Sequence, residues 1–226
     1  MSFFLTGTDT GVGKTFCAIH LLRLGREAGL RCAGMKPICC GDRDDAERLL
    51  AASSEGVTID ELNPVWLKTP AAPFAAALIE STSVDVNAIL DGFADLTRRF
   101  DCVVVEGVGG WLVPIRADYL VSDLACALNL PVVVVAANRL GVLNHTALTV
   151  RSIESHGARC AGIVLNDLGV AAGIATTTNG DILRRTVEVP ILTQVGEKSA
   201  EIPADWRPLY AREPNRTVSV PRTQVY

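Results

Sequence analysis

The sequence predicts a doubly wound α/β fold, in which helices cover both faces of a mainly parallel sheet. Short apolar runs alternate with helical patterns along most of the 226 residues, as in parallel sheets joined by crossover helices. The runs at 102–105 and 131–137 consist almost entirely of Val and Ala, which is typical of strands buried on both faces. No internal repeat or linker is present, so we predict one domain over residues 1–226.

Composition excludes several classes of protein. Hydrophobic residues make up 49% and charged residues 20% of the chain, and the net charge is −4, which fits a folded protein and disfavours nucleic acid as a partner. The start of the chain lacks the pattern of a signal peptide, and no apolar run is long enough to cross a membrane. Seven scattered Cys fit free thiols in a reducing cytoplasm.

The N-terminal stretch 3–15 predicts a strand, a glycine-rich turn and the start of a helix, which is the layout of a phosphate-binding loop. Backbone N–H groups in such a turn face an anion, and the helix directs its positive end toward it. Lys14 is expected to reach the β- and γ-phosphates and the Thr15 hydroxyl to bind Mg²⁺. Gly7 lies six positions before Gly13, one more than in the common motif. The helix is predicted to end at about Ala28.

A second strand is predicted at 31–37, with Lys36 at its carboxyl end, where ligands of open α/β sheets gather. The ammonium there would neutralise a phosphate or carboxylate, unless Lys36 is an ordinary solvated side chain. The acidic segment 41–47 then opens a helix to about Ser53. Its carboxylates either stabilise the first turn of this helix or approach the Mg²⁺.

The middle of the chain contains a proline-rich connection between residues 63 and 73, followed by an apolar helical run at 74–79. Ser83 is the predicted N-cap of a helix over about 84–99.

The second strong motif is a β-branched strand at 101–105 that ends in Glu106 and leads into the glycine turn 107–110. A carboxylate in this position is how a Walker-B acid is presented to Mg²⁺ near a phosphate-binding loop. Taken alone, the pattern also fits a strand that ends in an exposed Glu.

The second half continues the strand–helix alternation. A helix is predicted at about 122–128, a buried strand at 131–137, and a helix from Gly141 to about Ser155. Asn144 is the candidate N-cap of this last helix, whose free N–H groups could hold a carboxylate.

Toward the C-terminus the pattern weakens. A buried strand at 161–165 ends at Asn166, which suits the edge of a nucleobase or a simple turn. We predict a helix at about 178–187 and a short strand at 190–192, and we find no clear period in the tail from Gly196.

These residues resemble the ATP-dependent dethiobiotin synthetases of the P-loop NTPase superfamily, whose phosphate-binding loop has the same longer glycine spacing. The resemblance extends over about residues 3–167. The matching motifs occur in the family's order: Gly7–Thr15, Lys36-Pro37, Asp45-Ala46, Val105–Gly110, Leu140–His145 and Asn166-Asp167.

The resemblance implies the penultimate step of biotin synthesis, carried out by a cytoplasmic homodimer with a P-loop NTPase-like three-layer α/β/α fold. ATP and Mg²⁺ are used to join CO₂ to 7,8-diaminononanoate. One amine takes up CO₂ as a carbamate, the carbamate attacks the γ-phosphate, and the second amine closes a cyclic urea and expels phosphate.

The resemblance also implies the roles of individual residues. The turn at 141–144 is expected to bind the substrate carboxylate across the dimer interface. The implied set comprises Lys14 and Lys36 for catalysis; Thr10, Gly11, Val12, Gly13, Lys14, Thr15 and Asn166 for ATP; Thr15, Asp45 and Glu106 for the metal; and Lys36, Cys40, Gly141, Leu143 and Asn144 for the substrate.

The chain departs from the family pattern at three places. The family usually has Ser at the position of Cys40 and often at that of Ala72, both near the diamine. The family's Gly-Glu-Ile-Pro element is interrupted here within residues 196–203.

Three other functions compete with this interpretation. A regulatory ATPase switch of the partitioning type shares the fold, but such proteins usually carry an extra lysine early in the loop, where this chain has residues 8–10 (Thr-Asp-Thr). A substrate-binding relic without turnover is disfavoured because Lys14, Lys36 and Glu106 are all present. A related amide-forming synthetase with a different acid substrate is the closest enzymatic alternative.

Overall fold

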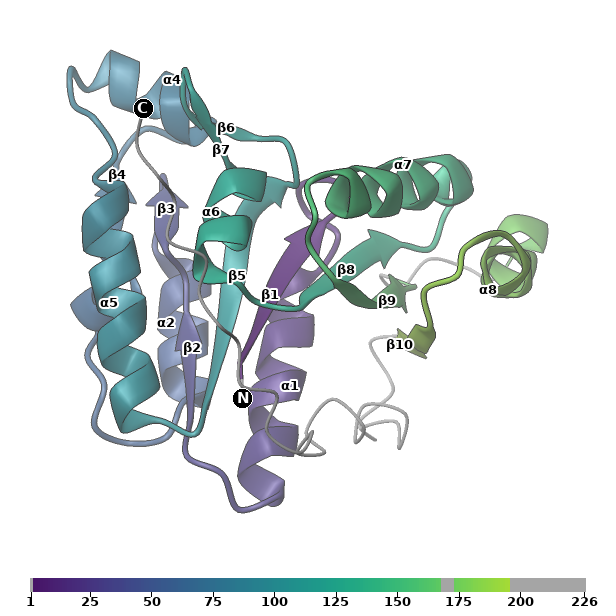
Figure 1. The fold of residues 1–226 in the computed structure, drawn as a ribbon, viewed down its shortest axis with the longest axis horizontal. Coiled ribbons are helices and arrows are strands. Elements are labelled where there is room, and N and C mark those ends of the chain that lie inside the picture. The colour runs from purple at the N-terminus through teal and green to yellow at the C-terminus, as the bar shows by residue number, and fades with distance from the viewer. Residues whose placement is uncertain (1, 168–172, 196–226) are drawn as a thin grey trace.

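A computed structural model describes residues 2–167 and 173–195. Its centre is a six-stranded parallel sheet in the order β10-β9-β8-β1-β5-β2, with helices on both faces (Figure 1). This arrangement confirms the predicted doubly wound α/β fold. The tail from Gly196, including the interrupted element at 196–203, lies outside the described residues.

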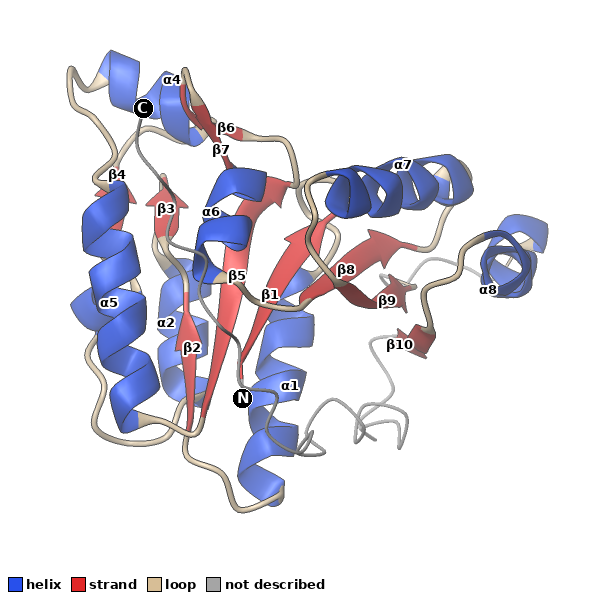
Figure 2. Cartoon of the chain, viewed as in Figure 1, coloured by secondary structure: helices blue, strands red, loops and turns tan. Residues whose placement is uncertain are grey.

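The strands at the middle of the central sheet are mostly buried, and two small two-stranded sheets lie beside it (Figure 2). The described strands are β1 (Ser2–Gly7), β2 (Cys32–Met35), β3 (Ile38–Cys40), β4 (Val65–Leu67), β5 (Cys102–Gly110), β6 (Pro114–Arg116), β7 (Tyr119–Leu120), β8 (Val132–Ala137), β9 (Cys160–Asn166) and β10 (Ile191–Val195).

Helices connect the strands of the main sheet and cover it (Figure 2). The described helices are α1 (Lys14–Glu27), α2 (Asp44–Ala52), α3 (Ile59–Leu62), α4 (Pro73–Ile79), α5 (Val86–Arg99), α6 (Val121–Leu128), α7 (Val142–Ser155) and α8 (Ile174–Thr186).

Successive side chains of each strand point to opposite faces of the sheet, which divides the core into two layers. In β5, Val104 packs with α1 and α2, whereas Val103 and Val105 pack with α5, α6 and α7. Because successive side chains of a strand point to opposite faces, a run of Val fills both layers. The strand β1 lies between β8 and β5, so the loop that follows it is held at the middle of the sheet's carboxyl edge.

Two predicted N-caps and one predicted helix start are wrong. The cap of α5 is Asp85, whose carboxylate accepts a hydrogen bond from the Ala88 N–H at 3.1 Å, so Ser83 lies outside the helix. The cap of α7 is Gly141 at φ 96°, a left-handed conformation that glycine adopts without strain, and Asn144 lies inside the first turn. Helix α8 begins at Ile174, about four residues before the prediction.

Two strand boundaries also differ from the prediction. Strand β5 does not turn after Glu106 but continues to Gly110, which pairs with Gly7 of β1. Pro37 removes a backbone donor, so β2 ends at Met35. The chain then forms β3, which leaves the main sheet and pairs with the unpredicted strand β4.

Within the described part of the chain, no helix has the length and apolar character needed to cross a bilayer.

Candidate active site

The loop between β1 and α1 has the geometry that its sequence predicts. Gly13 takes φ 90° immediately before Lys14 opens α1. Gly7 is required by close packing, because a Cβ atom there would lie 2.6 Å from the Asp9 carbonyl oxygen and 2.9 Å from the Lys14 Nζ. The loop therefore curls around its own lysine, and the N-terminus of α1 faces the space where a phosphate would bind.

Lys14 is a buried cation held by the loop itself. Its Nζ donates to the carbonyl oxygen of Asp9 at 3.1 Å. Burial, and next the nearby Lys36 ammonium, lower the pKa of Lys14 to about 8. An anionic ligand would compensate both effects, so this site favours a phosphate.

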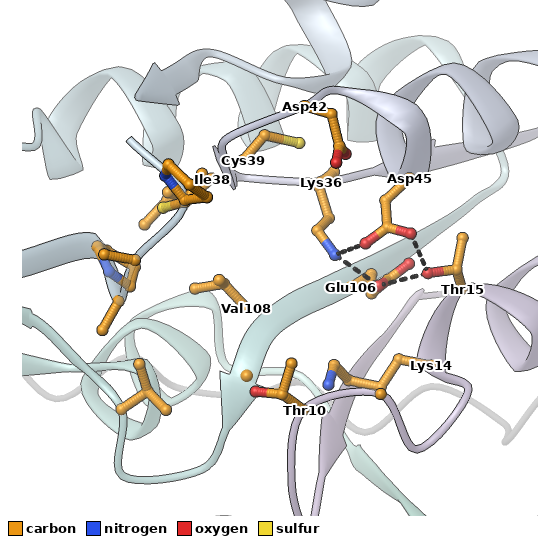
Figure 3. A pocket seen from close by; sticks show the side chains of 18 of the residues that line it. Thr10, Lys14, Thr15, Lys36, Ile38, Cys39, Asp42, Asp45, Glu106 and Val108 are labelled. Atoms are coloured by element: carbon orange, nitrogen blue, oxygen red, sulfur yellow. Dashed lines mark hydrogen bonds and ion pairs between the residues drawn. The ribbon is translucent and has the colours of Figure 1, made fainter. Parts of the chain in front are cut away.

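Four side chains from different parts of the chain meet beside this loop (Figure 3). The Thr15 Oγ1 lies 2.7 Å from Asp45 Oδ1 and 2.9 Å from Glu106 Oε1. The Lys36 Nζ lies 2.7 Å from Asp45 Oδ2 and 2.6 Å from Glu106 Oε1. The contributing elements are the start of α1, the β2–β3 junction, the first turn of α2 and the carboxyl half of β5. The sheet therefore brings together residues that are up to 91 positions apart.

The members of the cluster interact electrostatically, and all of them except Asp45 are buried. Lys36 is 4% exposed and Glu106 is 1% exposed. Burial alone would lower the pKa of Lys36, but the two carboxylates outweigh it and raise that pKa. Burial alone would raise the pKa of Asp45, but Lys36 outweighs it and lowers that pKa. Lys36 and Asp45 are therefore both charged near neutral pH.

The oxygen atoms of the cluster fit a magnesium ion. Mg²⁺ prefers carboxylate and hydroxyl oxygens and is usually held by one or two carboxylates together with substrate phosphates. Thr15, Asp45 and Glu106 supply such oxygens, and Glu106 Oε2 is buried without a hydrogen-bond partner. The described residues contain no group of three or more His, Cys, Asp or Glu suited to a metal, so phosphate oxygens would have to complete this site.

The cluster forms one wall of a cavity of about 610 Å³. The other wall is mainly apolar and includes β3, the segment 70–73, Val108 and Val113. Figure 3 shows Ile38 and Val108 away from the charged cluster, whereas the Cys39 side chain points toward Asp42 and Lys36. Burial, and next Glu80, raise the pKa of the Cys40 thiol to about 11, so it is neutral. Such a cavity can hold an apolar chain whose polar end approaches the phosphate site.

Most of the site residues predicted from sequence line this cavity, but a second group does not. The cavity is lined by Thr10, Gly11, Gly13, Lys14, Thr15, Lys36, Cys40, Asp45 and Glu106 among the predicted residues. The predicted residues outside its lining are Val12, Gly141, Leu143, Asn144 and Asn166.

Asn166 lies behind the loop. Its Nδ2 donates to the Val12 carbonyl oxygen at 3.0 Å, so β9 supports the phosphate-binding loop directly. The first turn of α7, with Gly141 and Asn144, lies at a separate edge of the molecule (Figure 1).

Sequence reasoning missed a buried network next to Asn166. The Asn138 Nδ2 donates to Asp167 Oδ1 at 2.7 Å, and the Asn179 Nδ2 donates to Asn138 Oδ1 at 2.9 Å. This network ties α8 to the carboxyl ends of β8 and β9. The signal was Asn138, which directly follows the Val/Ala strand β8, much as Asn166 ends β9.

The comparison with solved structures agrees with the fold. The chain superposes on the septum site-determining protein MinD of Pyrococcus horikoshii with a TM-score of 0.57 at 14% identity, covering 88% of this chain and 82% of that one. A ParA family ATPase of Chlorobium tepidum gives a TM-score of 0.53 at 14% identity, covering 87% and 84%. At such identities the likeness shows the fold alone. Fold and loop geometry together place this chain among the P-loop nucleotide-binding proteins.

Sequence relatives define the family more narrowly. Residues 1–200 match a family model described as an AAA domain. The chain is 43% identical over 194 residues to the ATP-dependent dethiobiotin synthetase BioD of Akkermansia muciniphila, covering 86% of this chain and 91% of that protein. It is 40% identical over 211 residues to the enzyme of the same name from Aromatoleum aromaticum, covering 90% and 93%. The chain belongs to the ATP-dependent dethiobiotin synthetase family, whose members are ligases that form C–N bonds.

Proposed function

We propose that this protein is a cytoplasmic, Mg²⁺-dependent enzyme that converts 7,8-diaminononanoate, CO₂ and ATP into dethiobiotin, ADP and phosphate. The observation that carries the proposal is the convergence of Lys14, Thr15, Lys36, Asp45 and Glu106 on one cavity with an apolar opposite wall. Membership of the synthetase family supplies the reaction. The free thiols of all seven cysteines are compatible with a reducing compartment.

The proposed reaction has three bond-forming steps. One amine nitrogen adds to CO₂ and loses a proton, which gives a carbamate. A carbamate oxygen attacks the γ-phosphorus, the bond to the β-phosphate oxygen breaks, and ADP leaves. The second amine then attacks the carbamoyl carbon, phosphate leaves with the electron pair of the C–O bond, and the cyclic urea is closed.

The roles of the protein groups follow from charge and position. Phosphoryl transfer depends on alignment and charge stabilisation rather than on covalent help from the protein. Lys14 and Lys36 would stabilise negative charge on the transferring phosphoryl group. Mg²⁺ held by Thr15, Asp45 and Glu106 would neutralise the phosphate oxygens. The apolar wall around Cys40 would exclude water and hold the carbon chain of the diamine.

We also propose a homodimer in which residues 141–144 of one copy receive the substrate carboxylate from the site of the other. This segment does not line its own cavity, and the neighbouring Leu140 is 87% exposed, with Leu112 and Leu148 also exposed. Exposed leucines beside a helix N-terminus suit a two-fold contact. Light scattering should give a dimer at assay concentration, and a fully active monomer would exclude the arrangement.

The function is tested by measuring phosphate release with each reactant omitted in turn. ATP hydrolysis should be slow with ATP and Mg²⁺ alone, because water is a poor substitute for a carbamate held in line with the γ-phosphate. Adding diamine and bicarbonate together should accelerate release, matched one-to-one by a product with the mass of the diamine plus CO₂ less water. A diamine that neither stimulates release nor gains this mass overturns the proposal, and a regulatory switch would ignore the diamine.

A further inference from the structure

The ammonium of Lys36 sits between the two carboxylates that we assign to the metal. It lies 2.7 Å from Asp45 and 2.6 Å from Glu106 (Figure 3). Lys14 is also buried nearby, but its ammonium donates to the Asp9 carbonyl oxygen rather than to a carboxylate. Of the two lysines, Lys36 is therefore the one in direct contact with both acids.

Two neighbouring carboxylates, one of them fully buried, need such a cation. Their like charges repel at short range in a medium of low dielectric constant, and an uncompensated buried charge is strongly destabilising. Glu106 uses Oε1 for both Lys36 and Thr15, while Oε2 has no partner. The acid is thus neutralised by Lys36 but keeps an oxygen available for a further cation.

The backbone around Lys36 is fixed by two hydrogen bonds, and its side chain extends from there to the wall of the cavity. The Lys36 N–H donates to the Leu62 carbonyl at 2.9 Å, and its carbonyl accepts from the Asn63 Nδ2 at 2.8 Å. The ammonium is carried on a flexible four-carbon stem, and it borders the open cavity. It can therefore leave the carboxylates by side-chain rotation alone.

We propose that Lys36 is an internal cation that fills the metal site of the empty enzyme and moves to the phosphoryl group only when metal and nucleotide arrive together. This inference rests on the proposed function for the identity of metal and nucleotide. A free divalent ion must displace a tethered ammonium and leave it without an anionic partner. A nucleotide provides that partner through its phosphates, so metal and nucleotide bind with positive, reciprocal coupling.

The proposal has a direct test that involves no diamine and no turnover. Binding of Mn²⁺, used as a paramagnetic substitute for Mg²⁺, is titrated by electron paramagnetic resonance with and without the nonhydrolysable analogue AMPPNP. The wild type should bind Mn²⁺ weakly alone and at least tenfold more tightly with AMPPNP. In Lys36→Met, which keeps the bulk of the stem but lacks the charge, nucleotide-free Mn²⁺ affinity should rise at least tenfold and the coupling to AMPPNP should shrink.

Two further variants separate this effect from a general loss of positive charge. Lys68→Met removes a lysine charge over the Trp66 ring and outside the cavity lining, so its nucleotide-free Mn²⁺ affinity should change by less than about threefold. The double variant Lys36→Met/Glu106→Gln should not show the rise in Mn²⁺ affinity expected for Lys36→Met, because one of the two carboxylates is gone. Equal Mn²⁺ affinity of wild type and Lys36→Met without nucleotide would overturn the proposal.

Stability gives an independent readout if Lys36→Met folds poorly. Without metal, its melting temperature should fall by several degrees because two carboxylates lose their cation. Adding Mn²⁺ should raise the melting temperature of the variant again as the metal site fills. The melting temperature of the wild type should change little. A variant that Mn²⁺ fails to restore or to fold would also overturn the proposal, because a metal would then not replace the ammonium. Failure of dethiobiotin formation would leave these metal measurements unaffected, so the two proposals fail separately.

Discussion

The two walls of the cavity differ in how tightly their residues are bound to one another. On the charged wall, Lys36 and Thr15 each contact both Asp45 and Glu106 within 3 Å. On the apolar wall, Ala71, Ala72 and the flanking prolines line the cavity with hydrocarbon, and the neutral thiol of Cys40 is half-buried. One wall is a coupled network, and the other is mainly a packed surface.

The difference follows from the chemistry each wall would serve. Charge on a transferring phosphoryl group must be met by cations at fixed places, and removing one member leaves the others buried and unpaired. A hydrocarbon chain needs only an apolar space of sufficient volume that excludes water, and several side chains of similar size can provide it. We therefore expect substitutions on the charged wall to have much larger effects than those on the apolar wall.

The largest effect is expected from Lys14→Ala. The variant removes a pre-placed charge whose stabilisation of a developing anion is worth about 3–4 kcal/mol in comparable sites. Turnover measured by phosphate release should fall by about two to three orders of magnitude. Lys68→Ala is a suitable control, because Lys68 lies over the Trp66 ring and does not line the cavity. If turnover of Lys14→Ala fell by less than tenfold, the expectation that substitutions on the charged wall have the larger effects would be wrong.

A smaller effect is expected from Glu106→Gln. The amide keeps the shape of the side chain and removes one negative charge from the proposed metal site. The Mg²⁺ concentration that gives half-maximal activity should rise about tenfold, and saturating Mg²⁺ should recover part of the turnover. Asp42→Asn is the matched control, since this carboxylate lines the same cavity and accepts a hydrogen bond from the Asp44 N–H rather than from Lys36 or Thr15. An unchanged Mg²⁺ requirement in Glu106→Gln would exclude Glu106 as a metal ligand.

The same contrast explains what could be predicted from the sequence. The phosphate-binding loop and Glu106 are local motifs, in which the glycines, the lysine and the strand before the acid fix the geometry over a few residues. Asp45 could not be separated from the neighbouring acids by pattern alone, because only the packing of α2 selects the carboxylate that reaches Lys36.

The errors have two origins, which are competing cap residues within a few positions and contacts between distant segments. Ser83 and Asn144 are good caps by residue type, yet Asp85 and Gly141 hold these positions. The β3–β4 pair was missed because strands of three residues carry almost no periodic signal. The Asn138 network was missed because its partners lie far apart along the chain.

The smallest effect is expected from Cys40→Ser, which places on the apolar wall the hydroxyl that the family usually has. With its pKa raised to about 11 by burial, the Cys40 thiol is protonated at neutral pH and is a weak donor. A hydroxyl that binds an amine would contribute about 1 kcal/mol, so the KM for the diamine should fall by up to about fivefold. Turnover and the KM for ATP should stay within about twofold.

Cys39→Ser is the control that separates this contact from a general change of the wall. Cys39 is buried against Ala46 and Leu62, so a hydroxyl there loses its solvation and should lower the free energy of unfolding by about 1–3 kcal/mol. Its effect should appear in thermal denaturation and not in the KM for the diamine. If Cys40→Ser instead lowered turnover tenfold or raised the KM for ATP, Cys40 would belong to the charged network, and the division of the cavity into two walls would be wrong.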